Sequence, residues 1–230
     1  MPSEPMTQTD QTNPSAVEKH VVLLGAGGHA HVLLSLLSMQ KRGVLAVYDD
    51  NQSLHGKQFG PTGLTISGGL NQVEQHNASE IELVNAIGSA HRPAARQTVY
   101  KRAIALGYCF ASLRHEQATV ACEAVLEPGC QIMAGVTIQA GAKIRANALI
   151  NTRAIIDHDS IIGEHTHVAP GVTICGGVNV GAGCHIGAGS TVIQGVTIGS
   201  GVIVGAGATV LCDVPNGQAV VGTPAKPIGN

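Results

Sequence analysis

One apolar position recurs every six residues from Val120 to Val210. All sixteen positions of this series hold valine, isoleucine or leucine, and no insertion breaks the register. A period of six fits neither an α-helix, which repeats about every 3.6 residues, nor a half-buried strand, which alternates every two. It is typical of a parallel β-helix built from hexapeptide repeats. We therefore expect a β-helix over about residues 118–213, with three hexads in each coil of 18 residues.

A second inward position lies two residues before each of these aliphatic residues. From Ala118 to Ala208 it holds only small or β-branched side chains, which together with the aliphatic series suits a narrow triangular prism. Glycine recurs at two further offsets, directly after the aliphatic residue and three residues after it, as at Gly181 and Gly177. We expect these positions to be corners, because tight turns favour a residue without a Cβ.

The first half of the chain has a different pattern. Residues 21–24 predict a buried strand, residues 31–40 a helix with one apolar face, and residues 44–48 a second strand. Residues 81–87 predict a third strand, the segment between Pro93 and Gly107 a helix, and residues 108–110 a fourth short strand. Residues 52–80 are expected to be irregular, apart from a short apolar piece at residues 64–66. Strands that alternate with helices indicate a small parallel α/β domain.

Two domains are therefore predicted. An α/β N-terminal Rossmann-like domain occupies residues 20–115, and a left-handed parallel β-helix occupies residues 116–230. Residues 1–19 are polar, lack the apolar core of a signal peptide and are expected to be a disordered tail. Residues 220–226 cannot continue the hexads and should cap the last coil, as repeat proteins require.

Composition narrows the choice of partners. The net charge is −2 and no basic block is present, so nucleic acid and anionic membranes are poor candidates. The apolar run at residues 21–37 is interrupted and too short to span a bilayer. Among the six cysteines, Cys130 and Cys184 would lie three coils apart, too far to form a disulfide. We expect free thiols and a cytoplasmic protein.

The segment Gly25–Ala30 (GAGGHA) lies between the first predicted strand and the first predicted helix. It fits the dinucleotide fingerprint in outline, and Asp49 and Asp50 end the next strand just over 20 residues later. Only about 95 residues are available, which is one mononucleotide-binding half. A helix N-terminus that binds some other phosphate is favoured over one that binds NAD, and a turn without a ligand is the alternative.

The triplet Asp157-His158-Asp159 is the strongest candidate for chemistry in the repeat. His158 occupies a corner position, and Gly176 lies one coil further on. Flanking carboxylates can hold a histidine in one tautomer and keep it basic, as a general base requires. An exposed corner histidine without a function is the alternative.

His167 lies nine residues from His158, which is half a coil. The two side chains are therefore expected on different sides of the prism, and they can share a site only where two chains meet. His165, His167 and His185 also suggest a zinc site, but no short ligand spacing supports one, and no metal requirement is expected. Cys175, beside Gly176, is interpreted as a small thiol without a catalytic role.

Several motifs together resemble a known family. They are the glycine turn GAGGHA, the Asp pair after the second strand, NAIG at residues 85–88, IDHDSIIG at residues 156–163 and VGTPAK at residues 221–226. They are similar to motifs of bacterial sialic-acid O-acetyltransferases and, more closely, of nucleotide-4-amino-sugar N-acetyltransferases. The resemblance covers about residues 20–228.

The resemblance implies a homotrimer in which acetyl-CoA lies between two β-helices. It implies that His158 is the general base and Asp159 its carboxylate partner, where many members carry glutamate. The positions that it assigns to acetyl-CoA are His167, Gly176, Ala188 and Ala206. Those that it assigns to the nucleotide sugar are Gly27, Gly28, His29, Asp49, Asp50 and Gly88. Independently, Pro170, Ala188 and Ala206 are spaced 18 apart and form a column of small corners against which a pantetheine arm could lie.

The expected function is acetyl-CoA-dependent N-acetylation of the 4-amino group of a nucleotide-linked amino-deoxysugar. Transfer would be direct, because the amine is itself the nucleophile. The closest alternative is O-acetylation of a sugar such as sialic acid. A zinc hydratase built on the same β-helix and a non-catalytic, nucleotide-sensing scaffold are alternatives from other classes.

Overall fold

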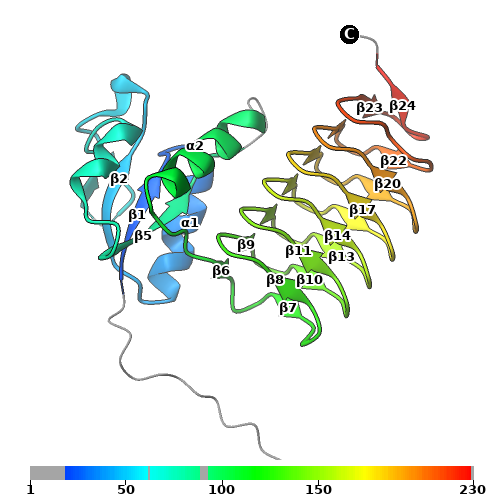
Figure 1. Cartoon of the computed structure of the whole chain (residues 1–230), viewed down its shortest axis with the longest axis horizontal. Helices are drawn as coiled ribbons and strands as arrows, with labels where there is room; N and C mark the ends of the chain where they lie inside the picture. Colours follow the sequence, from blue (N-terminus) through cyan, green and yellow to red (C-terminus); the bar gives the residue numbers. More distant parts are fainter. Residues whose placement is uncertain (1–18, 62, 89–92, 229–230) are drawn as a thin grey trace, which may run out of the picture.

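The computed structural model describes residues 19–61, 63–88 and 93–228, and every structural statement below refers to these residues. A small α/β domain lies beside a β-helix, as Figure 1 shows. The α/β domain contains β1 (His20–Leu24), α1 (Gly28–Met39), β2 (Val44–Tyr48), η1 (Gln52–Leu54), β3 (Gln58–Phe59), β4 (Leu64–Thr65), η2 (Leu70–Gln75), β5 (Ile81–Asn85) and α2 (Pro93–Ala105).

The β-helix consists of two-residue strands that follow one another every six residues. They are β6 (Leu113–Arg114), β7 (Thr119–Val120), β8 (Val125–Leu126), β9 (Gln131–Ile132), β10 (Thr137–Ile138), β11 (Lys143–Ile144), β12 (Leu149–Ile150), β13 (Ile155–Ile156), β14 (Ile161–Ile162), β15 (His167–Val168), β16 (Thr173–Ile174), β17 (Asn179–Val180), β18 (His185–Ile186), β19 (Thr191–Val192), β20 (Thr197–Ile198), β21 (Ile203–Val204) and β22 (Thr209–Val210). The chain ends with β23 (Ala219–Val221) and β24 (Lys226–Pro227).

The sheet of the α/β domain is parallel, with strand order β2-β1-β5. Its central strand is apolar on both sides. Val21 and Leu23 pack in one core cluster with the buried side chains of α1, whereas Val22 and Leu24 pack in a second cluster with residues of α2 and η2. A strand that is covered on both faces reads as a continuous apolar run, which is why β1 was recognisable in the sequence.

Three details of this domain differ from expectation. Helix α1 begins at Gly28 and not at residue 31, so His29 lies in its first turn. Residues 108–110 do not form a strand, because β5 pairs there only through one bridge between Leu83 and Phe110 before the chain enters the β-helix. Residues 52–80 contain the β3–β4 hairpin and two 3₁₀-helices, which are too short to produce a periodic signal.

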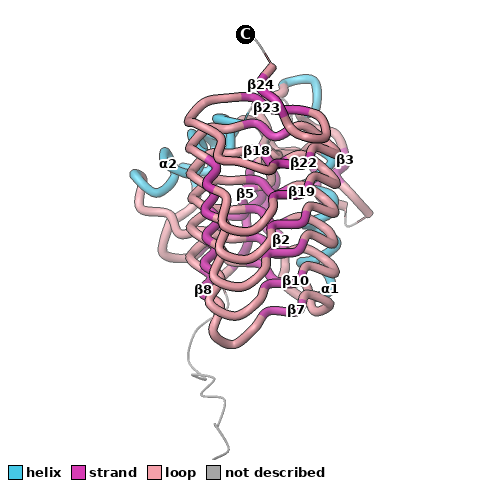
Figure 2. Tube along the Cα trace, turned by 90° about the vertical axis from the view of Figure 1, so that its right-hand side faces the viewer, coloured by secondary structure: helices cyan, strands magenta, loops and turns pink. Residues whose placement is uncertain are grey.

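The β-helix has the predicted period. Strands 18 residues apart pair in parallel, as Ile138, Ile156 and Ile174 do. Three sheets result, with strand orders β22-β19-β16-β13-β10-β7, β20-β17-β14-β11-β8 and β24-β23-β21-β18-β15-β12-β9-β6. Figure 2 shows the coils stacked with their strands aligned. An α/β domain followed by a parallel β-helix is thus confirmed.

The end of the β-helix is capped as expected. β23 continues the last sheet by pairing in parallel with β21, and β24 pairs with β23 in the antiparallel direction. The chain therefore turns back at this point and ends the hexad series.

The two glycine offsets have different physical causes. Gly177, three residues after an aliphatic residue, has a φ of +67°, a left-handed conformation that disfavours a Cβ. Gly181, directly after one, has no such φ, but an added Cβ would lie 2.8 Å from Ser200 Cα on the next coil. One set supplies a turn conformation and the other a close approach between coils.

Other residues replace glycine at four successive left-handed corners. Asn147, Arg153, Asp159 and His165 keep a positive φ between 56° and 62° although each carries a side chain. A non-glycine residue in this region costs of order 1–2 kcal/mol, and such strain concentrates at functional sites.

No helix among the described residues is long and apolar enough to cross a bilayer.

Candidate active site

His158 and Asp159 form a hydrogen-bonded pair on a corner between β13 and β14. His158 Nδ1 lies 3.0 Å from Asp159 Oδ2, and both side chains are mostly exposed. The Asp157 carboxylate accepts the backbone N–H of His158 at 2.7 Å, which holds the start of the turn. Because a carboxylate oxygen can only accept, Nδ1 of His158 carries the hydrogen in this pair. When His158 is neutral, its Nε2 therefore carries a free lone pair.

Both carboxylates favour protonation of this ring. The hydrogen bond to Asp159, and after it the charge of Asp157, raise the pKa of His158 above its ordinary value. An exposed imidazole with a raised pKa is a stronger base than a free histidine, and its Nε2 remains accessible to a substrate.

Glycines on the neighbouring coils make room for this pair. The His158 ring lies over Gly176, where an added Cβ would be 2.6 Å from His158 Cε1. The Asp159 carboxylate lies over Gly141 on the preceding coil, where an added Cβ would be 3.4 Å from its Cγ. The backbone N–H of Gly176 has no hydrogen-bond partner within the described ranges. A base and a free N–H donor thus lie side by side; we call Asp157–Asp159 with Gly176 the His158 corner.

The column of small corners has the predicted arrangement. The N–H of Gly189 bonds to Pro170 O at 3.0 Å and the N–H of Gly207 bonds to Ala188 O at 2.8 Å, so consecutive coils stack in register. Ala188 and Ala206 are exposed. Small exposed side chains leave a smooth corner along the β-helix axis.

The glycine turn is held by one of the two aspartates that follow β2. Asp49 Oδ2 accepts the N–H of Ala26 at 2.7 Å, and its Oδ1 accepts the N–H of Asn51 at 2.8 Å. Asp49 therefore braces the turn. Within the described part of the chain, Asp50 has one such bond, from the N–H of Leu70 at 2.9 Å to Oδ1, and its second oxygen is available to a ligand.

Asp50 also borders a pocket between α2 and η2. Leu24, Leu70 and Val99 are among its apolar walls, and Arg102 is a polar residue at its edge. Gly27, Gly28 and Gly88 face open space, since an added Cβ at these positions would meet no atom within 4 Å. The glycine turn is thus accessible.

His29 is half-buried and forms one end of a polar network between the two domains, whose other members are buried. Its Nε2 lies 2.8 Å from Oε1 of Gln131, whose Nε2 donates to Asn85 O at 2.8 Å. Burial, partly opposed by the bond to Gln131 and assisted by the charge of Arg96, lowers the pKa of His29 to about 4. His29 is therefore neutral at physiological pH.

Arg96 is the central residue of this network and is fully buried. Its Nε donates to Asn147 O at 3.0 Å and its Nη1 to Asn85 O at 2.8 Å, while Nη2 has no partner among the described residues. Asn147 continues the network to His165 Nδ1 at 2.9 Å. We call these six residues the interdomain seam: His29, Asn85, Arg96, Gln131, Asn147 and His165.

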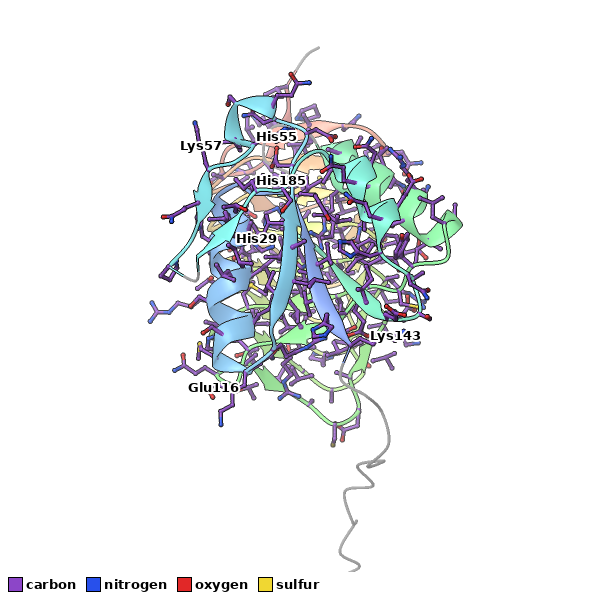
Figure 3. All side chains as sticks on the ribbon, turned by 90° about the vertical axis from the view of Figure 1, so that its left-hand side faces the viewer. His29, His55, Lys57, Glu116, Lys143 and His185 are labelled. Atoms are coloured by element: carbon purple, nitrogen blue, oxygen red, sulfur yellow. The ribbon has the colours of Figure 1, made fainter. Side chains whose placement is uncertain are left out.

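His167 and His185 lie on the same face of the β-helix as Gln131. Consecutive pairing places Gln131, Leu149, His167 and His185 in one ladder. The rings of His167 and His185 meet edge to face with centroids 5.2 Å apart. Burial, and after it the charges of His185, His29 and Arg96, lower the pKa of His167 to about 3. Figure 3 labels His29 and His185 in a view from the side of the α/β domain.

The single chain thus brings the predicted residues together in two separate groups. His158, Asp159 and Gly176 share one corner, whereas His29 of α1 and His167 of β15 lie where the α/β domain faces the β-helix. Gln131 and Arg96 were not predicted from the sequence, and Asn85 was named only as part of the NAIG motif. Asn147 and His165 carried a usable signal, because they replace glycine in the left-handed series. No group of three or more His, Cys, Asp or Glu side chains able to hold a metal occurs in the described part of the chain.

Comparisons with known proteins agree with this division. Residues 20–103 match the PglD N-terminal domain family, and residues 141–176 and 177–212 match the bacterial transferase hexapeptide family. The acetyltransferase domain of PglB from Neisseria gonorrhoeae is 32% identical, with a TM-score of 0.84, over 91% of this chain and 100% of that one. The chain belongs to the PglD-like hexapeptide acetyltransferases.

Other solved structures extend the comparison. PerB from Caulobacter crescentus, in complex with CoA and GDP-perosamine, is 34% identical with a TM-score of 0.81, and the match covers 91% of this chain and 97% of that one. The PglB domain has also been solved with acetyl coenzyme A. WeeI from Acinetobacter baumannii, 23% identical with a TM-score of 0.81, shares the fold. No match was found among curated protein sequences.

This acetyltransferase is therefore an enzyme of the PglD and PerB type. The hydratase and the non-catalytic scaffold that the sequence left open are not supported by these relatives.

Proposed function

We propose that this acetyltransferase transfers an acetyl group from acetyl-CoA to the 4-amino group of a nucleotide-linked deoxysugar. The observation that carries the proposal is the His158–Asp159 pair, which bonds Nδ1 of His158 to Asp159 and leaves Nε2 exposed beside Gly176 as the atom that can accept a proton. The complexes of PglB with acetyl coenzyme A and of PerB with CoA and GDP-perosamine support the choice of co-substrate and acceptor.

In the proposed reaction, the sugar amine attacks the thioester carbonyl carbon. His158 Nε2 accepts the proton that the amine loses, and the imidazolium that forms is stabilised by Asp159. The free N–H of Gly176 donates to the carbonyl oxygen as it gains negative charge, and such a donor is worth about 3 kcal/mol. As the carbon–sulfur bond breaks, the imidazolium of His158 returns its proton to the sulfur, so CoA leaves as the thiol and no covalent enzyme intermediate is required.

Acetyl-CoA is assigned to the column of Pro170, Ala188 and Ala206, with His167 as a further contact. His158 and His167 lie on different sides of the β-helix, so a site that uses both must contain residues from two chains. A head-to-tail contact of this kind closes into a ring or continues as a filament. We propose a closed trimer, and light scattering of a monomer at micromolar concentration would contradict it.

The sugar nucleotide is assigned to the α/β domain, with its phosphates near Gly27 and Gly28 and its nucleoside near Asp50. Gly88 borders the same edge of the sheet. Asp49 is occupied by the glycine turn, so Asp50 is the better nucleoside ligand. Calorimetry on the full chain tests this: a nucleotide sugar should bind and NAD should not. Six free cysteines support a cytoplasmic, reducing compartment for the enzyme.

The deciding experiment is a thiol-release assay with acetyl-CoA and a panel of UDP-, GDP- and dTDP-linked sugars. Each amino sugar is paired with the hydroxy sugar that carries oxygen in place of the 4-amino nitrogen. CoA release with amino sugars alone supports the proposal. Release with hydroxy sugars, including sialic acid, would assign O-acetylation instead.

A further inference from the structure

The hydrogen bonds of the interdomain seam have only one possible direction at His29. Asn85 O is a backbone carbonyl and can only accept, so the amide nitrogen of Gln131 must face it. The amide oxygen of Gln131 therefore faces His29 Nε2, 2.8 Å away. Because an oxygen accepts, His29 Nε2 carries the hydrogen.

The other end of the seam is directed in the same way. Asn85 Nδ2 donates to the carbonyl Arg96 O at 2.9 Å and to Asn147 Oδ1 at 3.1 Å. The amide nitrogen of Asn147 then faces His165 Nδ1, which must accept. Backbone carbonyls thus fix every amide in the seam, and no alternative orientation satisfies them.

A second proton on His29 is opposed by its surroundings. The charged group facing it from α2 is Arg96, and the titratable group facing it from the β-helix is His167. Arg96 donates to carbonyl oxygens and has no carboxylate among its described partners. Burial therefore adds to the repulsion between Arg96 and a charged His29 ring, which none of the described partners of Arg96 neutralises. His29 Nδ1 stays unprotonated and keeps its lone pair.

This lone pair has no hydrogen-bond partner among the residues that the structure describes. His29 lies in the first turn of α1, next to the exposed Gly27 and Gly28. A neutral nitrogen with an unused lone pair at the accessible glycine turn is suited to a ligand that donates a hydrogen.

We propose that His29 Nδ1 accepts a hydrogen bond from an N–H or O–H group of the acceptor sugar, and that Gln131 and Asn85 are positioning residues that fix the required tautomer. The proposal rests on the proposed function, since it names the part of the substrate that His29 contacts. It assigns His29 to the sugar and not to the phosphates. A sugar-nucleotide pyrophosphate offers only acceptor oxygens, and the free Nδ1 lone pair of a neutral His29 cannot form a hydrogen bond with an acceptor.

Two substitutions of His29 test the roles of its two ring nitrogens separately. His29→Asn keeps an oxygen acceptor near the position of Nδ1 but loses the donor to Gln131. His29→Gln keeps a donor near Nε2 but loses the acceptor. Calorimetry on the full chain, with the amino-sugar nucleotides and with the corresponding free nucleoside diphosphates, should rank affinity for the sugar nucleotide as wild type, His29→Asn, His29→Gln.

The loss in His29→Gln should be about tenfold, the usual size for one neutral hydrogen bond, and affinity for the nucleoside diphosphate should not change. Equal losses for both ligands, or a weaker His29→Asn than His29→Gln, would overturn the proposal. If wild type binds the sugar nucleotide without transferring an acetyl group, the proposed function fails while this ranking still decides the role of His29. Absence of any binding overturns both.

The role of Gln131 is tested by Gln131→Leu, because the next coil carries Leu149 at the same place in the ladder. Imidazole ¹⁵N spectra of the full chain should show His29 with hydrogen on Nε2 in wild type and a mixture of tautomers in Gln131→Leu. KM for the sugar nucleotide should rise several-fold in this variant, and KM for acetyl-CoA should not. A wild-type His29 with hydrogen on Nδ1, or an unchanged tautomer in Gln131→Leu, would contradict the assignment.

Discussion

The His158 corner and the interdomain seam place histidines in opposite surroundings. At the corner, His158 is exposed, and its bond to Asp159 raises its pKa. In the seam, burial and the neighbouring Arg96 lower the pKa of His29 to about 4, and burial also lowers that of His165. The same side chain thus becomes a base where carboxylates and water surround it, and a neutral hydrogen-bonding group where a buried cation does.

This comparison suggests that the two sites have different roles in the proposed reaction, one accepting a proton and the other orienting the sugar. A base must gain a proton during each cycle, so it needs a partner for the positive charge that appears. A group that only orients the acceptor sugar must not change its charge. The carboxylate of Asp159 meets the first requirement, and the seam around Arg96 meets the second.

The largest expected effect is the loss of the base itself. His158→Ala should lower kcat by about 10²–10⁴-fold, the range typical of a missing general base. Affinity for acetyl-CoA should persist, because the assigned column and His167 are untouched. Steady-state kinetics and calorimetry check the two expectations, and near wild-type turnover would remove His158 from the mechanism.

A smaller loss is expected when the base is present but displaced. Gly176→Ala would place a Cβ 2.6 Å from His158 Cε1, so the ring must move away. We expect kcat to fall about 100-fold, since misplacement by about 1 Å is that costly. Gly43→Ala is the matched control, because its Cβ would meet no atom within 4 Å. Equal activities of the two variants would show that the His158 ring need not lie over Gly176.

Replacing the carboxylate partner should change both the rate and its pH dependence. Asp159→Asn removes the largest cause of the raised pKa of His158, so that pKa should fall towards its ordinary value. Because the base acts unprotonated, the acidic limb of the kcat profile should move to lower pH. We expect kcat on the plateau to fall about tenfold, since the imidazolium loses its partner. A limb that moves to higher pH would contradict this assignment of the base.

Different parts of the enzyme were visible in the sequence to different degrees. The β-helix followed from one aliphatic residue in every six, because each coil repeats the same steric requirement. The His158 corner was also predictable, since its carboxylates are adjacent in sequence and its glycine lies one coil away. Local chemistry on a regular scaffold needs no knowledge of long-range contacts.

The seam was not predictable in the same way. Gln131 meets His29 and Asn85, and Arg96 meets Asn147, only because the two domains pack together, and nothing in the sequence neighbourhoods of Gln131 and Arg96 indicates it. The interrupted glycine series gave a partial signal at Asn147 and His165. At both positions the side chain contacts the α/β domain, Asn147 through Asn85 and His165 through the ring of Tyr100.

The smallest expected effect concerns His165, a buried histidine of the interdomain seam. Burial lowers the pKa of His165, so the unfolded chain binds a proton there more readily than the folded one. Folding stability must then fall as the pH drops below the ordinary histidine pKa of about 6.5.

His165→Asn removes this proton site while keeping an acceptor near Nδ1 for Asn147, and asparagine tolerates the left-handed conformation. The variant should lose less stability than wild type between pH 7 and pH 5. The Tm difference between wild type and the variant, measured by thermal unfolding, should therefore change in the variant's favour as the pH falls from 7 to 5. His20→Asn, at an exposed residue, should behave as wild type. If His165→Asn is as acid-sensitive as wild type by thermal unfolding, the seam does not hold His165 neutral, and the contrast with the His158 corner is lost.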